Sequence, residues 1–187
     1  MIEFEILETE RLLLKKITPA LFADLFANYP EAEIKKLLGL STEEEFLKEK
    51  AKSEGGYTTY DRTILAFVLV SKESGQTIGR CGYHNWYKDH SRAELGYALN
   101  NDESKRKGYM GEAVKAILDY GFKVMNLNRI EAFIGPANEA SLRLVKKNGF
   151  VQEGQLRQHF VRNGEAEDSV VFSLLKDDTR LCRTEQS

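Results

Sequence analysis

Residues 99–125 limit the possible folds more than any other part of the chain. A strand-like run ends at Leu99, a basic loop containing Gly108 and Gly111 follows, and apolar residues then recur at helical spacing. The apolar residues of this stripe are Ala113, Val114, Ile117, Leu118, Gly121, Val124 and Met125. The order predicts a strand, a loop and a long amphipathic helix from Gly111 that packs one face on a sheet.

The loop in front of this helix has the features of an anion site. Backbone N–H groups at a helix start lack intrahelical partners and carry partial positive charge, and glycines let a ligand approach closely. Lys105, Arg106 and Lys107 add positive charge. The loop therefore suits a pyrophosphate; the alternative is a surface loop whose glycines serve the turn and whose cations are solvated. Its spacing fits neither a Walker A loop nor a dinucleotide fingerprint.

The rest of the chain alternates between strand and helix patterns. Period-two segments predict strands over 10–17, 64–71, 76–86, 93–99, 129–134, 150–159 and 167–175. Capping signals predict helices over 19–29, from Thr42 to about residue 55, and from Asn138 to Asn148. We expect one α+β domain, 1–176, and a C-terminal tail, 177–187. Its mixed, mostly antiparallel sheet would have about seven strands flanked by helices.

Composition narrows the functional classes. The 27 basic and 29 acidic residues give a formal charge of −2, so the chain has no net positive charge to attract the phosphate backbone of a nucleic acid. The longest apolar run, 64–70, is far shorter than the ~20 residues of a membrane span, and the acidic start does not resemble a secretory signal. Cys81 and Cys182 fit neither a disulfide framework nor a zinc site. We expect a cytoplasmic protein with no metal, nucleic acid or membrane partner.

A second motif lies on the helix predicted from Asn138. Residues 138–150 have the pattern N-x-x-S-x-x-L-x-x-x-x-G-F, downstream of K-R-K-G-Y-M-G at 105–111. Together the two motifs resemble the GCN5-related N-acetyltransferase (GNAT) superfamily. T-E-R-L-L-L at 9–14, A-E-L-G-Y at 93–97 and K-G-Y-M-G-E-A at 107–113 are similar to its RimJ/RimL-type branch, which includes ribosomal-protein N-terminal acetyltransferases. The resemblance covers about residues 8–175.

The resemblance implies acetyl-coenzyme A (acetyl-CoA) as cosubstrate. Its pyrophosphate would lie on the loop amides of 106–111, and its pantetheine arm would pair with the edge of 94–99, where the sheet splays away from 129–135. The residues implied in cofactor binding are Tyr97, Leu99, Arg106, Lys107, Gly108, Tyr109, Met110, Gly111 and Asn138. Lys105 and Met110 depart from the superfamily's common Q/R-x-x-G-x-G/A loop, which leaves open which amides contact phosphate.

Glu94 is the leading candidate for a general base. A carboxylate in an otherwise apolar strand is expected either to be paired with a polar group or to have a function. As a base, Glu94 would take a proton from the acceptor amine directly or through a water. The alternative is an ion pair with Arg92 or Arg129. Glu131, on the neighbouring strand and in reach of the acceptor, is the reserve base.

Ser141 is the candidate acid for the leaving thiolate. Many superfamily members carry a Tyr seven residues after the motif Asn, but Val145 stands there in this chain, and the resemblance implies that Ser141 takes the role. The alternative is an ordinary serine in the first turn of a helix. His84 and Trp86, near the end of their strand, are expected to line the acceptor pocket or to pack.

The resemblance implies a primary amine as acceptor. We expect the N-terminal α-amine of a protein, since its pKa of ~8 makes it easier to deprotonate than a lysine at ~10.4. Alternatives are a small amine such as a polyamine or an aminoglycoside, or an acyl-CoA-binding protein without catalysis. A polyamine pocket would need several carboxylates, which the early helices could supply from Glu31, Glu33, Glu43, Glu44 and Glu45. The alternative is that these glutamates lie on solvated helix faces. The chain is expected to be a monomer or a homodimer.

Overall fold

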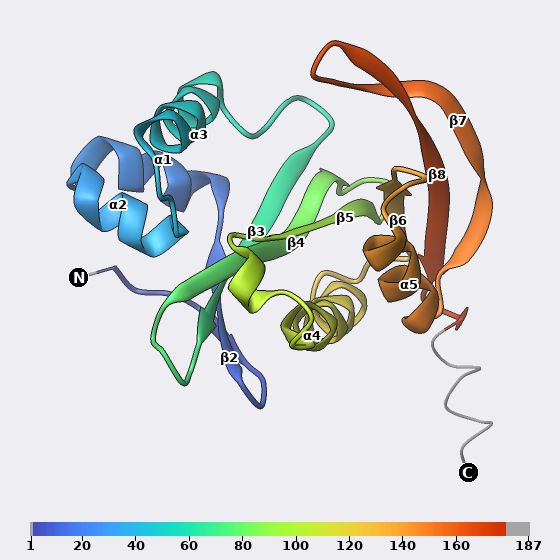
Figure 1. The fold of residues 1–187 in the computed structure, drawn as a ribbon, viewed down its shortest axis with the longest axis horizontal. Helices are drawn as coiled ribbons and strands as arrows, with labels where there is room; N and C mark the ends of the chain where they lie inside the picture. Colours follow the sequence, from blue (N-terminus) through green and yellow to red (C-terminus); the bar gives the residue numbers. More distant parts are fainter. Residues whose placement is uncertain (1, 179–187) are drawn as a thin grey trace.

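An eight-stranded sheet in the order β1-β2-β3-β4-β5-β6-β8-β7 organises the molecule (Figure 1). The computed structural model describes residues 2–178. The strands are β1 (Ile6–Glu8), β2 (Leu12–Ile17), β3 (Thr63–Ser71), β4 (Thr77–Tyr87), β5 (Arg92–Leu99), β6 (Arg129–Ile134), β7 (Val151–Arg162) and β8 (Glu165–Leu175). The helices are α1 (Pro19–Asn28), α2 (Glu31–Leu38), α3 (Glu43–Gly55), α4 (Tyr109–Lys123) and α5 (Glu139–Lys147), with a 3-10 turn, η1 (Asp102–Ser104), before α4. β5 and β6 are parallel and the other neighbours are antiparallel, which confirms the predicted class.

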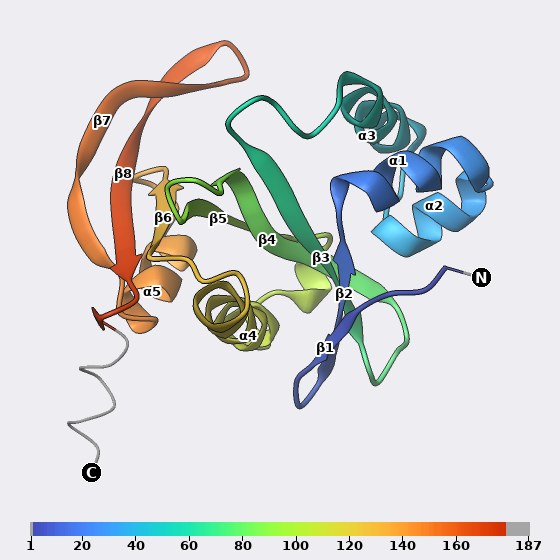
Figure 2. The same cartoon turned by 180° about the vertical axis from the view of Figure 1, so that it is seen from behind.

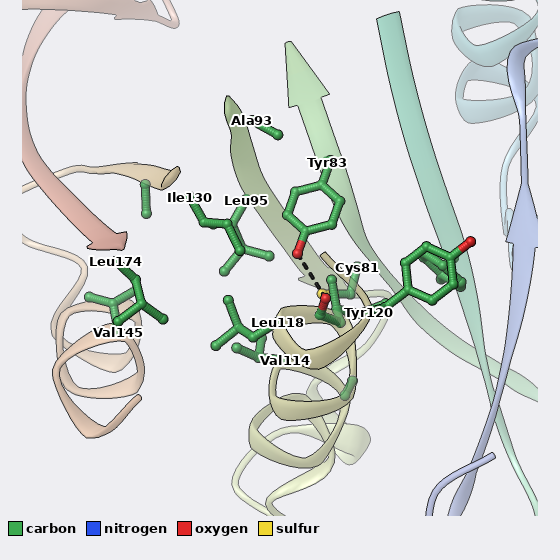
Figure 3. Packing of buried hydrophobic residues seen from close by; sticks show 14 of the residues in the cluster. Cys81, Tyr83, Ala93, Leu95, Val114, Leu118, Tyr120, Ile130, Val145 and Leu174 are labelled. Carbon is green, nitrogen blue, oxygen red and sulfur yellow. Dashed lines mark hydrogen bonds between the residues drawn. The ribbon is translucent and has the colours of Figure 1, made fainter. Parts of the chain in front are cut away.

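Helices lie on both faces of this sheet. α1, α2 and α3 gather on one face, near β3 and β4, whereas α4 and α5 lie on the other (Figures 1 and 2). The apolar stripe of α4 is buried against the sheet from Ala113 to Gly121, as its spacing predicts (Figure 3). Its predicted continuation to Val124 is wrong, because the helix ends at Lys123 and the Val124 side chain is exposed. The Tyr83 hydroxyl donates a hydrogen bond to the Ile117 carbonyl over 2.8 Å. Gly121 leaves room for that ring, since a Cβ there would lie 2.1 Å from the Tyr83 hydroxyl oxygen. The helix is thereby held firmly beneath β4 and β5.

Helix starts follow their capping residues. At α1 the Thr18 side chain accepts a hydrogen bond from the Leu21 N–H, and α3 begins with the predicted capping box between Thr42 and Glu45. The predicted start of α4 at Gly111 is wrong. The helix begins earlier because Gly108, with a left-handed φ of 80°, is already its N-cap.

The structure contains two elements that the sequence patterns do not predict. β1 is a three-residue strand paired with β2, too short for a periodic signal, and it raises the strand number from about seven to eight. α2 buries Ile34 and Leu38 and ends at Gly39, which has a left-handed φ of 66°. The predicted β7–β8 hairpin is confirmed around Asn163 and Gly164, but both strands extend further toward the turn than expected.

The splay between β5 and β6 is confirmed and sets the position of the site. The two strands pair only at their beginnings, where the last pair in register is Glu94 with Glu131. Beyond it β6 continues beside β8, while Leu95–Leu99 of β5 has no pairing with β6. One edge of β5 is thus free to hydrogen-bond a ligand.

Residue 1 and residues 179–187, which hold most of the predicted tail and Cys182, lie outside the described residues. Among residues 2–178, no helix is both long and apolar enough to cross a membrane.

Candidate active site

A cleft opens where β5 leaves β6, between the start of α4 and α5. Its volume of about 720 Å³ is typical of a small-molecule site. The cleft is lined by Tyr97, Ala98, Leu99, Ser104, Lys105, Arg106, Gly108, Tyr109, Met110, Gly111, Asn138, Ala140, Ser141, Arg143 and Leu144. The structure therefore brings together the residues predicted to bind the cofactor, with the exception of Lys107. Ala98, Ser104 and Ala140 also line the cleft, and no sequence motif singles them out. Leu144, the leucine of the second motif, lines it too.

The start of α4 presents free backbone amides to this cleft. Gly108 caps the helix without a side-chain hydrogen bond, and the first intrahelical bond runs from the Glu112 N–H to the Gly108 carbonyl. The amides of residues 109–111 consequently lack intrahelical partners and carry the partial positive charge of a helix start. All three residues line the cleft, so the position fits a phosphate group.

A set of contacts from the start of β2 fixes the loop before α4. Arg11 binds Glu112 through Nε over 2.7 Å and donates from Nη1 to the Lys107 carbonyl over 2.9 Å. Thr9 donates to the same Glu112 carboxylate over 2.6 Å, and the Arg11 guanidinium lies 4.7 Å from the centre of the Tyr109 ring. Burial alone would raise the pKa of Glu112, but these hydrogen bonds outweigh it and lower the pKa. The T-E-R and G-E-A motifs thus meet in space to position the loop.

A second cavity, of about 590 Å³, lies on the α1–α3 side of β3, β4 and β5. It is lined by Phe22, Glu49, Lys52, Gly55, Gly56, Tyr57, Ile64, Leu65, Ala66, Arg80, Cys81, Gly82, Tyr83, His84, Gly96, Tyr97 and Ala98. Tyr97 and Ala98 line both this cavity and the cleft. The two hollows therefore adjoin at the stretch of β5 that has left β6.

Charged groups inside this cavity are already paired. Glu49 is buried and binds Arg80 over 2.9 Å and Lys52 over 2.7 Å. Burial alone would raise the pKa of Glu49, but the hydrogen bonds from the two cations lower it. The Tyr57 hydroxyl is buried and finds no hydrogen-bond partner within residues 2–178, and burial raises its pKa to about 12. A ligand in the cavity would meet one free hydroxyl and more positive than negative charge.

His84 and Glu94 face each other across β4 and β5. They are direct partners in the strand register, so their side chains lie on the same face of the sheet. The imidazole leans along β5, because a Cβ on Gly96 would lie 1.9 Å from His84 Nε2. His84 keeps exposed surface, but protein crowds the ring inside the cavity, and this desolvation lowers its pKa. Glu94 raises that pKa, and Lys52 and Arg80 lower it.

Glu94 is held by Asn85 rather than by an arginine. Asn85 donates from Nδ2 to Glu94 Oε2 over 2.7 Å and accepts from Arg62 Nη1 over 3.2 Å. The alternative ion pair of Glu94 is wrong, because both arginines proposed for it bind Glu131, Arg92 over 2.9 Å and Arg129 over 2.7 Å. Glu94 is not among the described residues that line the cavity.

Glu131 and Trp86 lie apart from the described linings of both hollows. The two arginines hold Glu131 in an ion-pair cluster, which leaves it poorly placed as a reserve base. Trp86 packs on the edge of the α4-side core and carries Lys88 over its ring at 4.9 Å. The structure therefore does not bring these two residues to the predicted acceptor pocket.

Three polar groups meet at the α5 side of the cleft. Asn138 is the N-cap of α5, and its Oδ1 accepts from the Ser141 N–H over 3.2 Å, which leaves its Nδ2 for a ligand. The Tyr97 hydroxyl is buried and has no hydrogen-bond partner in the described chain. Burial raises the pKa of Tyr97, and the nearby Ser141 side chain lowers it, although the pair falls short of hydrogen-bond geometry. These groups border the point where the hollows adjoin.

A cleft for a phosphate-bearing arm and a cavity for a second reactant, adjoining at a splayed strand, define a two-substrate transferase. Residues 11–151 match the family model described as an acetyltransferase (GNAT) domain, and the chain belongs to this family. It is an acetyl-CoA-dependent N-acetyltransferase. The free amides and unpartnered hydroxyl of the cleft fit such a cosubstrate.

Relatives support the family and differ in their named acceptors. The chain is 33% identical over 174 residues, 92% of its own length and 98% of the relative's, to the uncharacterized N-acetyltransferase YoaA of Bacillus subtilis. It is 33% identical over 81 residues, 43% of each chain, to spermidine N(1)-acetyltransferase of Escherichia coli. The solved ribosomal-protein-S5-alanine acetyltransferase of Vibrio fischeri has a TM-score of 0.68 at 25% identity, covering 93% of this chain and 98% of that one.

Proposed function

We propose that this enzyme acetylates the N-terminal α-amine of a protein by direct transfer from acetyl-CoA. The observation that carries the proposal is that the cleft and the cavity share Tyr97 and Ala98. A thioester reaching this point from the cleft would meet an amine entering from the cavity. Direct transfer between two bound substrates requires such a meeting point.

In the cleft, the free amides of residues 109–111 together with Lys105 and Arg106 would hold the pyrophosphate. Asn138 Nδ2 would donate to a pantetheine carbonyl, and the free edge of β5 would pair with the pantetheine amides. Acetyl-CoA itself supplies an activated acyl group as a thioester. The remaining chemistry falls to side chains near Tyr97.

Proton transfer is assigned to the two sides of this meeting point. We assign Glu94 as the base on the acceptor side, acting through an intermediary, since the described lining of the cavity does not include it. Ser141, at the cleft side, is assigned as the acid for the leaving sulfur. The unpartnered Tyr97 hydroxyl beside Ser141 would position the thioester or the serine.

Charge in the cavity favours a protein N-terminus over a polyamine. The only carboxylate in the described lining, Glu49, is bound by both Lys52 and Arg80, so an acceptor carrying several ammonium groups would meet like charges. A peptide presents one amine followed by carbonyl oxygens, which the Tyr57 hydroxyl and the cations suit. The name of the Vibrio fischeri structure points the same way.

A small amine is the second candidate, favoured by the partial match to spermidine N(1)-acetyltransferase. The glutamates considered for an acidic rim do not lie in the described lining of the cavity. Glu31 and Glu43 both bind Lys35, and Glu45 caps α3. A cytoplasmic location, the lack of a nucleic acid partner and a monomeric or dimeric state stay predictions from the sequence.

The test is acetyl transfer to a panel of peptides with free N-termini, the same peptides with blocked N-termini, spermidine and an aminoglycoside. Thiol release and product mass report the reaction. Transfer to free α-amines alone supports the proposal. Transfer only to spermidine or to the aminoglycoside contradicts the protein acceptor, and tight acetyl-CoA binding without any transfer indicates an acyl-CoA-binding protein.

A further inference from the structure

We propose that His84 is the catalytic residue that takes the proton from the acceptor amine, and that Glu94 acts through it. The inference deepens the proposed function, on which it rests, by naming the intermediary between Glu94 and the acceptor. Its basis is placement, because His84 lines the acceptor cavity and Glu94 is its direct register partner on the neighbouring strand.

The lean of the imidazole brings it toward the point of transfer. Along β5, Gly96 lies between Glu94 and the two residues, Tyr97 and Ala98, that line both hollows. The edge of the His84 ring covers Gly96, since a Cβ on that glycine would lie 1.9 Å from Nε2 and 2.0 Å from Cδ2. Only a glycine at position 96 admits this arrangement.

Charged groups around His84 suit a base that is neutral at rest. Desolvation of the ring inside the cavity lowers the pKa of His84, and Lys52 on α3 and Arg80 on β4 also disfavour the imidazolium. Glu94 on β5 favours the imidazolium and stabilises it once the proton has moved. Glu49 binds both of these cations. A neutral imidazole backed by a carboxylate can accept a proton near neutral pH.

The proposed step balances within the two substrates and two side chains. The amine nitrogen forms a bond to the thioester carbonyl carbon, and the carbon–sulfur bond breaks. The nitrogen gives one proton to His84, and the sulfur takes one proton from Ser141. Solvent then restores both side chains, so the net products are the amide and the free thiol.

Asn85 makes Glu94 a fixed partner for the imidazole. Arg62 is a donor only and an ionised carboxylate is an acceptor only, so the contacts of Asn85 admit one amide orientation, with Oδ1 toward Arg62 and Nδ2 toward Glu94. Asn85 itself lies in a register irregularity of β4 with a left-handed φ of 44°. In this role Asn85 and Glu94 are positioning residues and His84 is the catalytic one.

The experiment measures kcat/KM for a peptide α-amine between about pH 5 and pH 9 in the wild type, His84→Gln, Glu94→Gln and the control His90→Gln. His90 is exposed and packs on Tyr87, away from the described linings. We expect a rising limb below pH 6.5, the ordinary pKa of histidine. His84→Gln should abolish the limb and lower kcat/KM by about 10²- to 10⁴-fold. Glu94→Gln should keep the limb but move it to lower pH.

Chemical rescue provides a second measurement. His84→Ala should regain part of the lost rate when imidazole is added, while its KM for acetyl-CoA stays at the wild-type value. A limb that persists in His84→Gln and vanishes in Glu94→Gln would make Glu94 the direct base and overturn the inference, with the proposed function intact. A wild type that transfers acetyl groups to no amine would overturn both.

Discussion

Asn85 Nδ2 lies 2.7 Å from Glu94 Oε2, and this hydrogen bond links an irregular point of β4 to the carboxylate behind the acceptor cavity. Arg62, next to the start of β3, completes the link through Asn85 Oδ1. One oxygen of Glu94 is thereby held, on the strand next to its register partner His84. The geometry of the acceptor side depends on this three-residue chain.

Asn85→Gly should lower kcat/KM about tenfold, since a hydrogen bond to a charged group contributes about 1.5–3 kcal/mol. Glycine keeps the left-handed backbone and removes only the side chain. The rising limb of the pH profile should move to lower pH, as in Glu94→Gln, but by a smaller amount. Asn163→Gly, at φ 51° in the β7–β8 turn, is the matched control and should behave as the wild type. Wild-type kinetics in Asn85→Gly would contradict the positioning role.

Gly96→Ala should displace the His84 ring, because the new Cβ would lie 1.9 Å from Nε2. We expect a loss of kcat of about 10²-fold or more with an unchanged KM for acetyl-CoA. The double variant His84→Ala with Gly96→Ala relieves the collision and should recover thermal stability without recovering activity. Initial rates and thermal unfolding check both points; full activity in Gly96→Ala would show that the ring position is unimportant.

Ser141→Ala should lower kcat while leaving the KM for acetyl-CoA nearly unchanged, because the Ser141 backbone N–H, not its hydroxyl, binds the Asn138 cap. A general acid contributes about 10²- to 10⁴-fold. Tyr97→Phe removes the adjacent buried hydroxyl and so distinguishes the role of tyrosine from that of serine. If kcat falls by this factor in Tyr97→Phe and does not fall in Ser141→Ala, the acid is Tyr97. Steady-state kinetics with a thiol readout suffices.

Arg11→Gln should raise the KM for acetyl-CoA by about tenfold, with a small change in kcat. The substitution removes the contacts of Arg11 with Glu112 and the Lys107 carbonyl, and the loop before α4 loses its anchor. Arg157→Gln, on the exposed strand β7, is a control that loses the same charge. Calorimetric titration of acetyl-CoA checks the result directly, and equal affinities for the two variants would show that the anchor is dispensable.

Glu153 on β7 predicts a pH dependence of stability. The Arg129 guanidinium, and then the Ser173 hydroxyl, lower its pKa to about 2 from 4.5. A carboxylate whose folded-state pKa is lowered stabilises the fold above its unfolded value, and that contribution is lost as pH falls from about 4.5 toward 2. The side chain is 40% exposed, so solvent screening limits the effect to under about 1 kcal/mol.

Glu153→Gln should therefore lower the free energy of unfolding at pH 7 and weaken its fall between pH 4.5 and about 2. Urea denaturation at several pH values provides the measurement, with the exposed Glu165→Gln as control. Parallel curves for wild type and Glu153→Gln across this range would contradict the prediction.

Local patterns predicted the cofactor half of the site. The stripe on α4, the Thr18 and Thr42 caps and the glycine loop each depend on residues within a few positions of one another, and such signals are legible in a sequence. The order of the longer strands and helices was therefore predicted, and the resemblance to the GNAT superfamily implied a cofactor site along β5. Short elements without a period, β1 and α2, were not predicted for the same reason.

The acceptor half was decided by the tertiary structure. From the sequence, Arg92 and Arg129 were possible ion-pair partners of Glu94. In the structure both arginines bind Glu131, and Glu94 accepts a hydrogen bond from Asn85 instead. Such pairings join residues far apart in the chain and change with one step of strand register, so spacing cannot foresee them. Sequence alone thus determined the fold class and most residues of the cleft that we assign to acetyl-CoA. Strand register and the packing of α3 over the sheet decided which side chains line the cavity that we assign to the amine.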